Sequence, residues 1–156
     1  MSVPVRRYLK KYLYHIENLP YDQNIHLTKG GHIPMVLGQI LTGKTNIPYN
    51  KIDVDPFEDE LPIVVNARKV NDYQVLITLK KVRFFNTFLY KSFHDWLLQK
   101  VLWGKSTGAT EVDVIWSVIS DLEIQDDITF DALKKASYRL RMERNYPDFR
   151  QRDGMF

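Results

Sequence analysis

The stretch VRFFNTFLYKSFHDWLLQKVLW, residues 82–103, governs the architecture of this chain because it holds the longest helical pattern. Its apolar residues recur every three or four positions, which is the spacing of one face of an α-helix. The buried stripe that this spacing predicts comprises Phe85, Phe88, Leu89, Phe93, Trp96, Leu97 and Val101. We therefore expect a long helix at the centre of the hydrophobic core.

The first twenty residues predict an amphipathic helix. The pattern runs from Val5 to Ile16, and Pro20 ends it. The apolar side comprises Val5, Leu9, Tyr12, Leu13 and Ile16, and the expected basic outer face comprises Arg6, Arg7, Lys10 and Lys11.

The middle of the chain predicts a small sheet and a short helix. NIHLT (24–28) is expected to be a short strand, and the helix that starts near Ile33 is expected to end at Gly43 in the left-handed conformation. LPIVVNA (61–67) and YQVLITL (73–79) are β-rich runs on either side of a turn, which predicts a β-hairpin.

Two further helices are expected at about 111–122 and 129–144, with Thr110 and Thr129 as N-caps. With 156 residues, of which 44% are apolar, the chain is long enough to bury a core. The predicted fold is a mostly helical α+β single domain with one β-hairpin, over residues 1–145, ending in a helix-turn-helix-like pair at 109–145 and followed by a basic tail at 146–156.

The cellular setting is predicted from two absences. The sequence has no cysteine and no apolar run near the roughly 18 residues that a membrane helix needs. We expect a cytoplasmic protein without membrane contact, or a virion component if a phage encodes it.

The segment GQILTGKT, Gly38 to Thr45, matches the phosphate-loop pattern G-x-x-x-x-G-K-[ST]. A phosphate loop requires a helix that starts at the lysine, but Pro48 follows closely and the next residues lack a helical period. A nucleotide-binding protein is kept as an alternative, whereas a helix C-terminus explains the segment better.

No catalytic site, cofactor or metal site is expected. The four histidines, His15, His26, His32 and His94, show no metal-ligand spacing. His26 and His32 flank a Gly-Gly turn and are interpreted as ordinary loop residues. Asp53 and Asp55, with Lys69 downstream, could hold Mg²⁺ as in a nuclease, but their Pro-containing loop favours solvated acids. A non-enzymatic function is therefore favoured.

The last predicted helix is the candidate functional element. Its apolar stripe, Phe130, Leu133, Ala136 and Leu140, is expected to face the core. Arginine, lysine and tyrosine on the other side suit phosphates and bases, and a small serine allows close approach. The candidate nucleic-acid-binding residues are Lys134, Lys135, Ser137, Tyr138, Arg139, Arg141 and Arg144.

This basic face can also be interpreted without nucleic acid. The net charge is only +3, and the seven acids from Glu111 to Asp131 could pair with these bases or leave a solvated face. The sorted charges also suit contacts between subunits, as in a structural or adaptor protein of a phage particle. Phe84, Tyr90 and Trp103 could supply a homo-oligomer interface.

DALKKASYRLR (131–141), together with YLKKYL (8–13) and the intervening order of elements, resembles small uncharacterised basic proteins of phages and mobile elements of Bacteroidota. The resemblance implies a DNA-binding regulator or accessory factor, with DNA or RNA and other phage proteins as possible partners, or a virion component.

Overall fold

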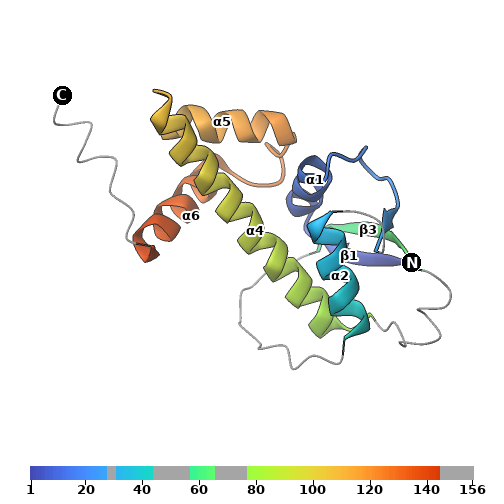
Figure 1. Ribbon diagram of the computed structural model, residues 1–156. Helices are drawn as coiled ribbons and strands as arrows, with labels where there is room; N and C mark the ends of the chain where they lie inside the picture. Colours follow the sequence, from blue (N-terminus) through green and yellow to red (C-terminus); the bar gives the residue numbers. More distant parts are fainter. Residues whose placement is uncertain (28–30, 44–56, 66–76, 145–156) are drawn as a thin grey trace. The chain divides into compact units, whose positions relative to one another are not determined.

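The computed structural model describes residues 1–27, 31–43, 57–65 and 77–144, and it shows a mostly helical α+β fold (Figure 1). The predicted fold class is therefore confirmed. The elements in chain order are β1 (Ser2–Val5), α1 (Arg7–Ile16), β2 (Ile25–His26), α2 (His32–Thr42), β3 (Asp59–Val64), α4 (Leu79–Ser106), α5 (Glu111–Leu122) and α6 (Phe130–Glu143).

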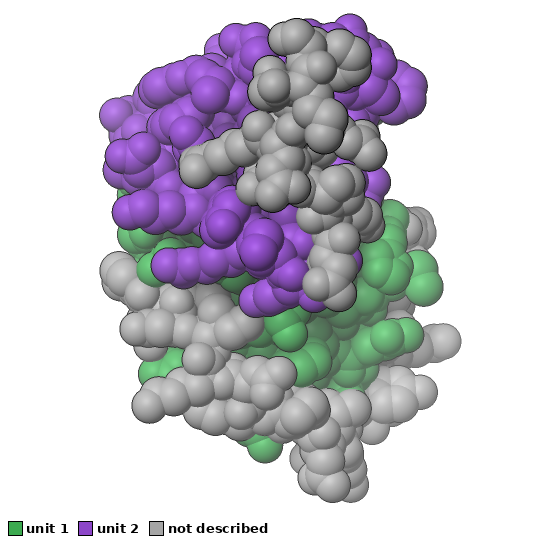
Figure 2. Space-filling model, turned by 90° about the vertical axis from the view of Figure 1, so that its left-hand side faces the viewer, with its two compact units in different colours: residues 1–91 green, residues 92–156 purple. Residues whose placement is uncertain are grey.

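The chain divides into two compact units, residues 1–91 and 92–156, which Figure 2 shows in different colours. Helix α4 contributes its first half to one unit and its second half to the other. The single domain expected over residues 1–145 stays a prediction. The expected basic tail at 146–156 lies outside the described residues.

The first unit contains a three-stranded sheet in the order β1-β3-β2. Strand β1 is antiparallel to β3, with Val3 opposite Leu61, and β2 is parallel to β3, with Ile25 opposite Ile63. These four side chains are buried. Burial alternates along β1 and along the Glu60–Val64 part of β3, so one face of the sheet is turned toward the core.

Residues 2–5 form a strand, so the prediction that the first helix starts at Val5 is wrong. Pro4 has no N–H to donate, but β1 is an edge strand and tolerates it. The side chain of Asn86 on α4 is fully buried, and it holds the backbone in place at the junction of β1 and α1. Its amide donates to the carbonyl of Pro4 at 2.9 Å, and its oxygen accepts from the backbone N–H of Arg6 at 3.1 Å.

The prediction that Lys10 belongs to a basic outer face of the first helix is also wrong, because Lys10 is buried. Its side chain is 3% exposed, and its ammonium bonds the carboxylate of Asp59 at 3.1 Å and also pairs with Asp22. Burial alone would lower the pKa of Lys10, but the hydrogen bonds to Asp22 and Asp59 outweigh burial and the pKa is raised. Lys10 is therefore a charged internal link between α1, the Asp22 turn and β3.

The phosphate-loop match falls on α2. Gly38 to Thr42 are helical, so their N–H groups serve helical hydrogen bonds rather than turning inward around a phosphate. Gly43 ends the helix in an extended conformation, with φ −83° and ψ 142°, so the left-handed conformation expected for it is wrong. Lys44 and Thr45 lie outside the described residues.

The second unit is built from the C-terminal half of α4, α5 and α6. The predicted N-caps are confirmed: Thr110 accepts a hydrogen bond from Asp113 N–H, and Thr129 accepts one from Ala132 N–H, each at 3.2 Å. Helix α5 ends at Leu122, and the next residue, Glu123, adopts a left-handed conformation with φ of 52°. The buried apolar residues of α5, the loop and α6 are Ile115, Val118, Ile119, Leu122, Ile124 and Leu133.

The predicted hairpin and the acidic loop are only partly covered by the structure. Residues 61–64 of the expected first arm belong to β3, which pairs with β1 and β2, whereas residues 66–76, with the turn and most of the second arm, lie outside the described residues. Asp53, Asp55 and Lys69 also lie outside them. His94 is described, and it is buried on α4. His26 is the last residue of β2 and His32 is the first residue of α2, so the interpretation of these two as loop residues is wrong.

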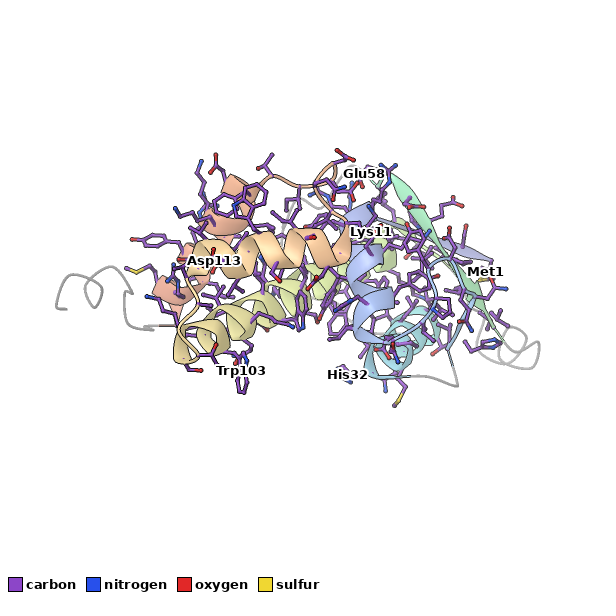
Figure 3. All side chains as sticks on the ribbon, turned by 90° about the horizontal axis from the view of Figure 1, so that it is seen from above. Met1, Lys11, His32, Glu58, Trp103 and Asp113 are labelled. Carbon is purple, nitrogen blue, oxygen red and sulfur yellow. The ribbon has the colours of Figure 1, made fainter. Side chains whose placement is uncertain are left out.

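The helices of the described residues are each too short or too polar to cross a membrane. Of the aromatic residues expected at an oligomer interface, Trp103 is 72% exposed and projects from α4 (Figure 3), whereas Phe84 and Tyr90 are half-buried.

Candidate nucleic-acid interface

The inner side of α6 differs from the predicted apolar stripe. Leu133, Ser137 and Arg141 are buried, and they follow one another at intervals of four residues along one side of the helix. The other expected core residues, Phe130, Ala136 and Leu140, are half-buried. The buried side of α6 therefore includes two residues that the sequence assigned to nucleic-acid contact, Ser137 and Arg141.

Arg141 is buried because a carboxylate on α5 neutralises it. Its Nη2 lies 3.0 Å from both carboxylate oxygens of Glu111, whose side chain is 16% exposed. A charge-assisted pair of this kind offsets part of the cost of removing both charges from water. The pair links the first turn of α5 to the last turn of α6, so Arg141 has a structural role.

Arg144 is also paired within the second unit. Its guanidinium binds the carboxylate of Asp95 on α4, and the two side chains are 40% and 46% exposed. An exposed pair of this kind contributes at most about 1 kcal/mol to stability. Arg144 can therefore exchange its partner at little cost, but it does not present an uncompensated charge.

Four of the predicted residues lie outside the buried side of α6. Lys135, Tyr138 and Arg139 are exposed and Lys134 is half-buried. We call Lys134, Lys135, Tyr138 and Arg139 the α6 basic face. Across the part of the chain that the structure describes, Lys134, Lys135 and Arg139 form no ion pair with an acid.

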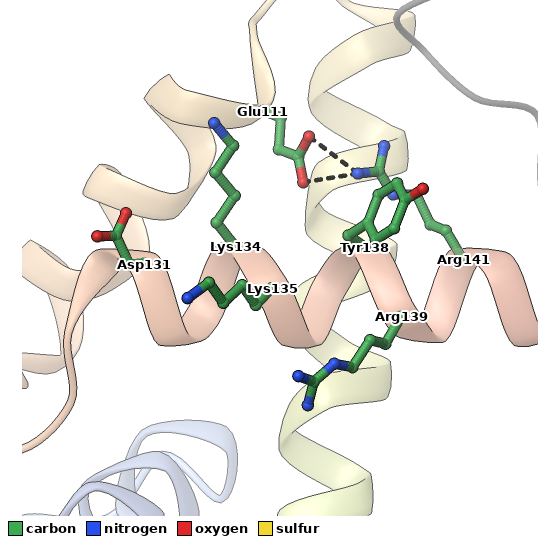
Figure 4. A pocket seen from close by; sticks show the side chains of 7 residues that line it. All are labelled: Glu111, Asp131, Lys134, Lys135, Tyr138, Arg139 and Arg141. Carbon is green, nitrogen blue, oxygen red and sulfur yellow. Dashed lines mark hydrogen bonds and ion pairs between the residues drawn. The ribbon is translucent and has the colours of Figure 1, made fainter.

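A shallow hollow of about 570 Å³ lies over this face (Figure 4). In the close-up, Lys134 and Tyr138 project on the same side of α6 as Glu111, whereas Arg139 projects on the opposite side. The charges are thus spread along and around the helix, which suits an extended ligand better than a compact one. The lining residues are Glu111, Asp131, Lys134, Lys135, Tyr138, Arg139 and Arg141.

An aromatic pair lies at the N-terminal end of the same helix. The rings of Trp116 on α5 and Phe130 on α6 stack with centroids 4.8 Å apart and an interplanar angle of 14°. Trp116 is 53% exposed even so. The sequence did not single out Trp116 as a binding residue, because its spacing places it with the core stripe of its helix.

No metal site is visible in residues 1–27, 31–43, 57–65 and 77–144, where no three His, Cys, Asp or Glu side chains gather as such a site would require. His94 is buried in the second unit, and burial lowers its pKa to about 4 against a smaller raising effect of Asp95. The imidazole is therefore neutral at pH 7.

Comparisons of the chain with protein families, curated proteins and solved structures found no match.

Proposed function

We propose that this protein binds nucleic acid through the α6 basic face. The observation that carries the proposal is the division of the basic residues of α6 into two groups. Arg141 and Arg144 are neutralised by Glu111 and Asp95, whereas Lys134, Lys135 and Arg139 face solvent without an ion pair among the described residues.

This division favours a basic face that contacts a ligand. It disfavours the alternative, in which acids of the same chain neutralise the whole face. Seven acids occur between Glu111 and Asp131, and one of them, Glu111, pairs with a base of α6 in the described structure. Self-pairing accounts for Arg141 but leaves three cations available for phosphates.

Each residue of the face has a chemical role in the proposal. Lys134 and Lys135 neutralise phosphates, and Arg139 can bind a phosphate or a base edge with two parallel hydrogen bonds. Tyr138 adds a ring that can stack on a base. A regulator or accessory factor of a phage or mobile element would use such a face without any catalytic step.

The dependence of binding on salt tests the proposal. Each phosphate that a cation neutralises releases condensed counterions, so affinity falls as salt rises. Three contacts predict a log–log slope of about −2.7 for duplex DNA and about −2.1 for a single strand. Replacing Lys134, Lys135 and Arg139 together by alanine should remove nearly all of that slope, measured by fluorescence anisotropy of labelled DNA.

A matched control is available on α4. Lys80, Lys91 and Lys100 are exposed, and replacing them by alanine removes the same total charge. This control should retain the parent slope. If both triple variants lose affinity equally, the effect is one of net charge, and the α6 basic face is not the binding site.

A further inference from the structure

Two exposed aromatic residues of the second unit, Trp116 and Tyr138, lie at the two ends of a row of α6 side chains. At one end, Phe130 stacks on one face of the Trp116 ring, and Trp116 is 53% exposed. At the other end, Tyr138 is 41% exposed, and the guanidinium of Arg141 lies 6.0 Å from its ring centroid.

The three α6 residues concerned lie in one row. Phe130, Lys134 and Tyr138 are four residues apart, so they share one side of the helix over about 12 Å. The row runs aromatic, cation, aromatic. Lys135 and Arg139 also line the hollow, and Arg139 projects from the side of α6 opposite Lys134 and Tyr138 (Figure 4). Bases stack on aromatic rings and phosphates bind cations, so this alternation matches the alternation of base and phosphate along a polynucleotide.

The acids around the row argue against a duplex. A helix-turn-helix places the N-terminal part of its second helix in the major groove, while the first helix crosses the phosphate backbone. Here the first turn of α5 carries Asp113 beside Glu111, which is paired with Arg141, and the first turn of α6 carries Asp131. A duplex docked in this way would bring its phosphates toward these carboxylates.

A single strand avoids this conflict. It carries one line of phosphates, which can follow Lys134, Lys135 and Arg139 while the bases turn toward the rings. A duplex keeps its bases stacked on each other and has no free base faces for Trp116 or Tyr138.

We propose that the α6 basic face, together with Trp116, binds a single-stranded polynucleotide, with its phosphates at Lys134, Lys135 and Arg139 and its bases stacked on Trp116 and Tyr138. This inference rests on the proposed function and specifies its ligand.

The test compares a labelled single-stranded oligodeoxynucleotide of about 15 nucleotides with the duplex of the same sequence, a length that covers the usual site size. The single strand should bind the full chain at least tenfold more tightly at the same salt concentration. Tyr138→Ala should weaken single-strand binding by about 5- to 150-fold, the effect of losing one stacked base, whereas Tyr138→Phe should keep the parent affinity.

Trp116 has its own variants and a matched control. Trp116→Ala should weaken single-strand binding within the same range, and Trp116→Phe should restore most of it. Trp103→Ala removes a more exposed ring from α4 and should leave binding unchanged. Circular dichroism of each variant confirms that the helices are intact.

The outcomes separate this inference from the proposed function. Salt-dependent binding through the three cations that favours the duplex and is unaffected by Tyr138→Ala would overturn the single-strand inference alone. Equal losses for Trp103→Ala and Tyr138→Ala would overturn it too. If neither form of DNA binds in a salt-dependent manner, the proposed function itself is wrong.

Discussion

Lys10 and His94 are buried titratable residues to which the fold gives opposite charge states. Two carboxylates keep Lys10 protonated, whereas burial keeps His94 neutral. Hydrogen-bonded opposite charges favour the ionised form and desolvation favours the neutral form, so the surroundings decide the charge rather than the residue type.

Removing the acids around Lys10 should cost more than removing the lysine. The Lys10 side chain is 3% exposed, whereas those of Asp59 and Asp22 are 26% and 62% exposed. Without Lys10 the carboxylates can still be hydrated, but without the carboxylates the ammonium is left buried and unpaired. Lys10→Met should lower the free energy of unfolding by about 1–2 kcal/mol, and the double variant Asp22→Asn, Asp59→Asn by about 3–5 kcal/mol.

Urea denaturation at pH 7 measures both values. A larger loss of unfolding free energy for Lys10→Met than for the double variant would contradict this expectation. It would show that the unpaired carboxylates destabilise the fold more than the unpaired ammonium.

His94 should make the protein less stable in mild acid. Its pKa falls from about 6.5 in the unfolded chain to about 4 in the folded protein, so the unfolded state binds the extra proton between these values. The stability contributed by the neutral imidazole is complete above pH 6.5 and is lost as the pH falls toward 4, by up to about 3 kcal/mol.

Unfolding free energies at pH 7 and pH 4.5 test this expectation. His94→Leu should remove most of the loss between the two pH values. The exposed His26 provides the control, because His26→Gln should keep the parent dependence. An unchanged pH dependence in His94→Leu would assign the acid sensitivity to other groups.

At the scale of elements, close approach between helices matters as much as apolar area. Gly104 on α4 is buried against α5, and a Cβ at this position would lie 2.4 Å from Cγ2 of Val114. That separation is too short for two carbon atoms, and Val114 cannot easily turn away because β-branched side chains are stiff in helices. A glycine is needed here for space and not for its backbone freedom.

Gly104→Ala should therefore destabilise the second unit. Alanine favours the helix by about 1 kcal/mol, but overpacking typically costs about 1–3 kcal/mol, so a net loss is expected. The double variant Gly104→Ala, Val114→Ala should recover most of it by removing the clashing methyl group. Thermal unfolding of the parent and of both variants measures the effect, and a single variant as stable as the parent would contradict the close approach.

At the scale of the whole molecule, the distribution of charge says more than the net charge of +3. Some bases are used inside the fold, such as Lys10 with Asp59 and Arg141 with Glu111. Others, such as Lys134 and Arg139, have no acid partner within the described ranges. A modest net charge can therefore coexist with a locally basic surface.

Features with a local cause could be predicted from the amino-acid sequence alone. The apolar period of residues 82–103 predicted α4, and Thr110 and Thr129 predicted the starts of α5 and α6, because a helix face and an N-cap depend on residues only three or four positions apart. The position of Lys134, Lys135, Tyr138 and Arg139 outside the buried side of α6 followed from the same spacing.

Burial and exposure of these residues depend on contacts between distant parts of the chain, which the local pattern does not contain. Val5 lies in a strand because β1 pairs with β3, and Arg6 and Pro4 bond Asn86 about 80 residues away. Lys10 is buried because Asp59 lies 49 residues further along the chain, and Arg141 because Glu111 lies 30 residues before it. The helical period of the sequence determines which face of a helix carries a charged residue. Whether that residue can be buried depends on a residue of opposite charge elsewhere in the chain.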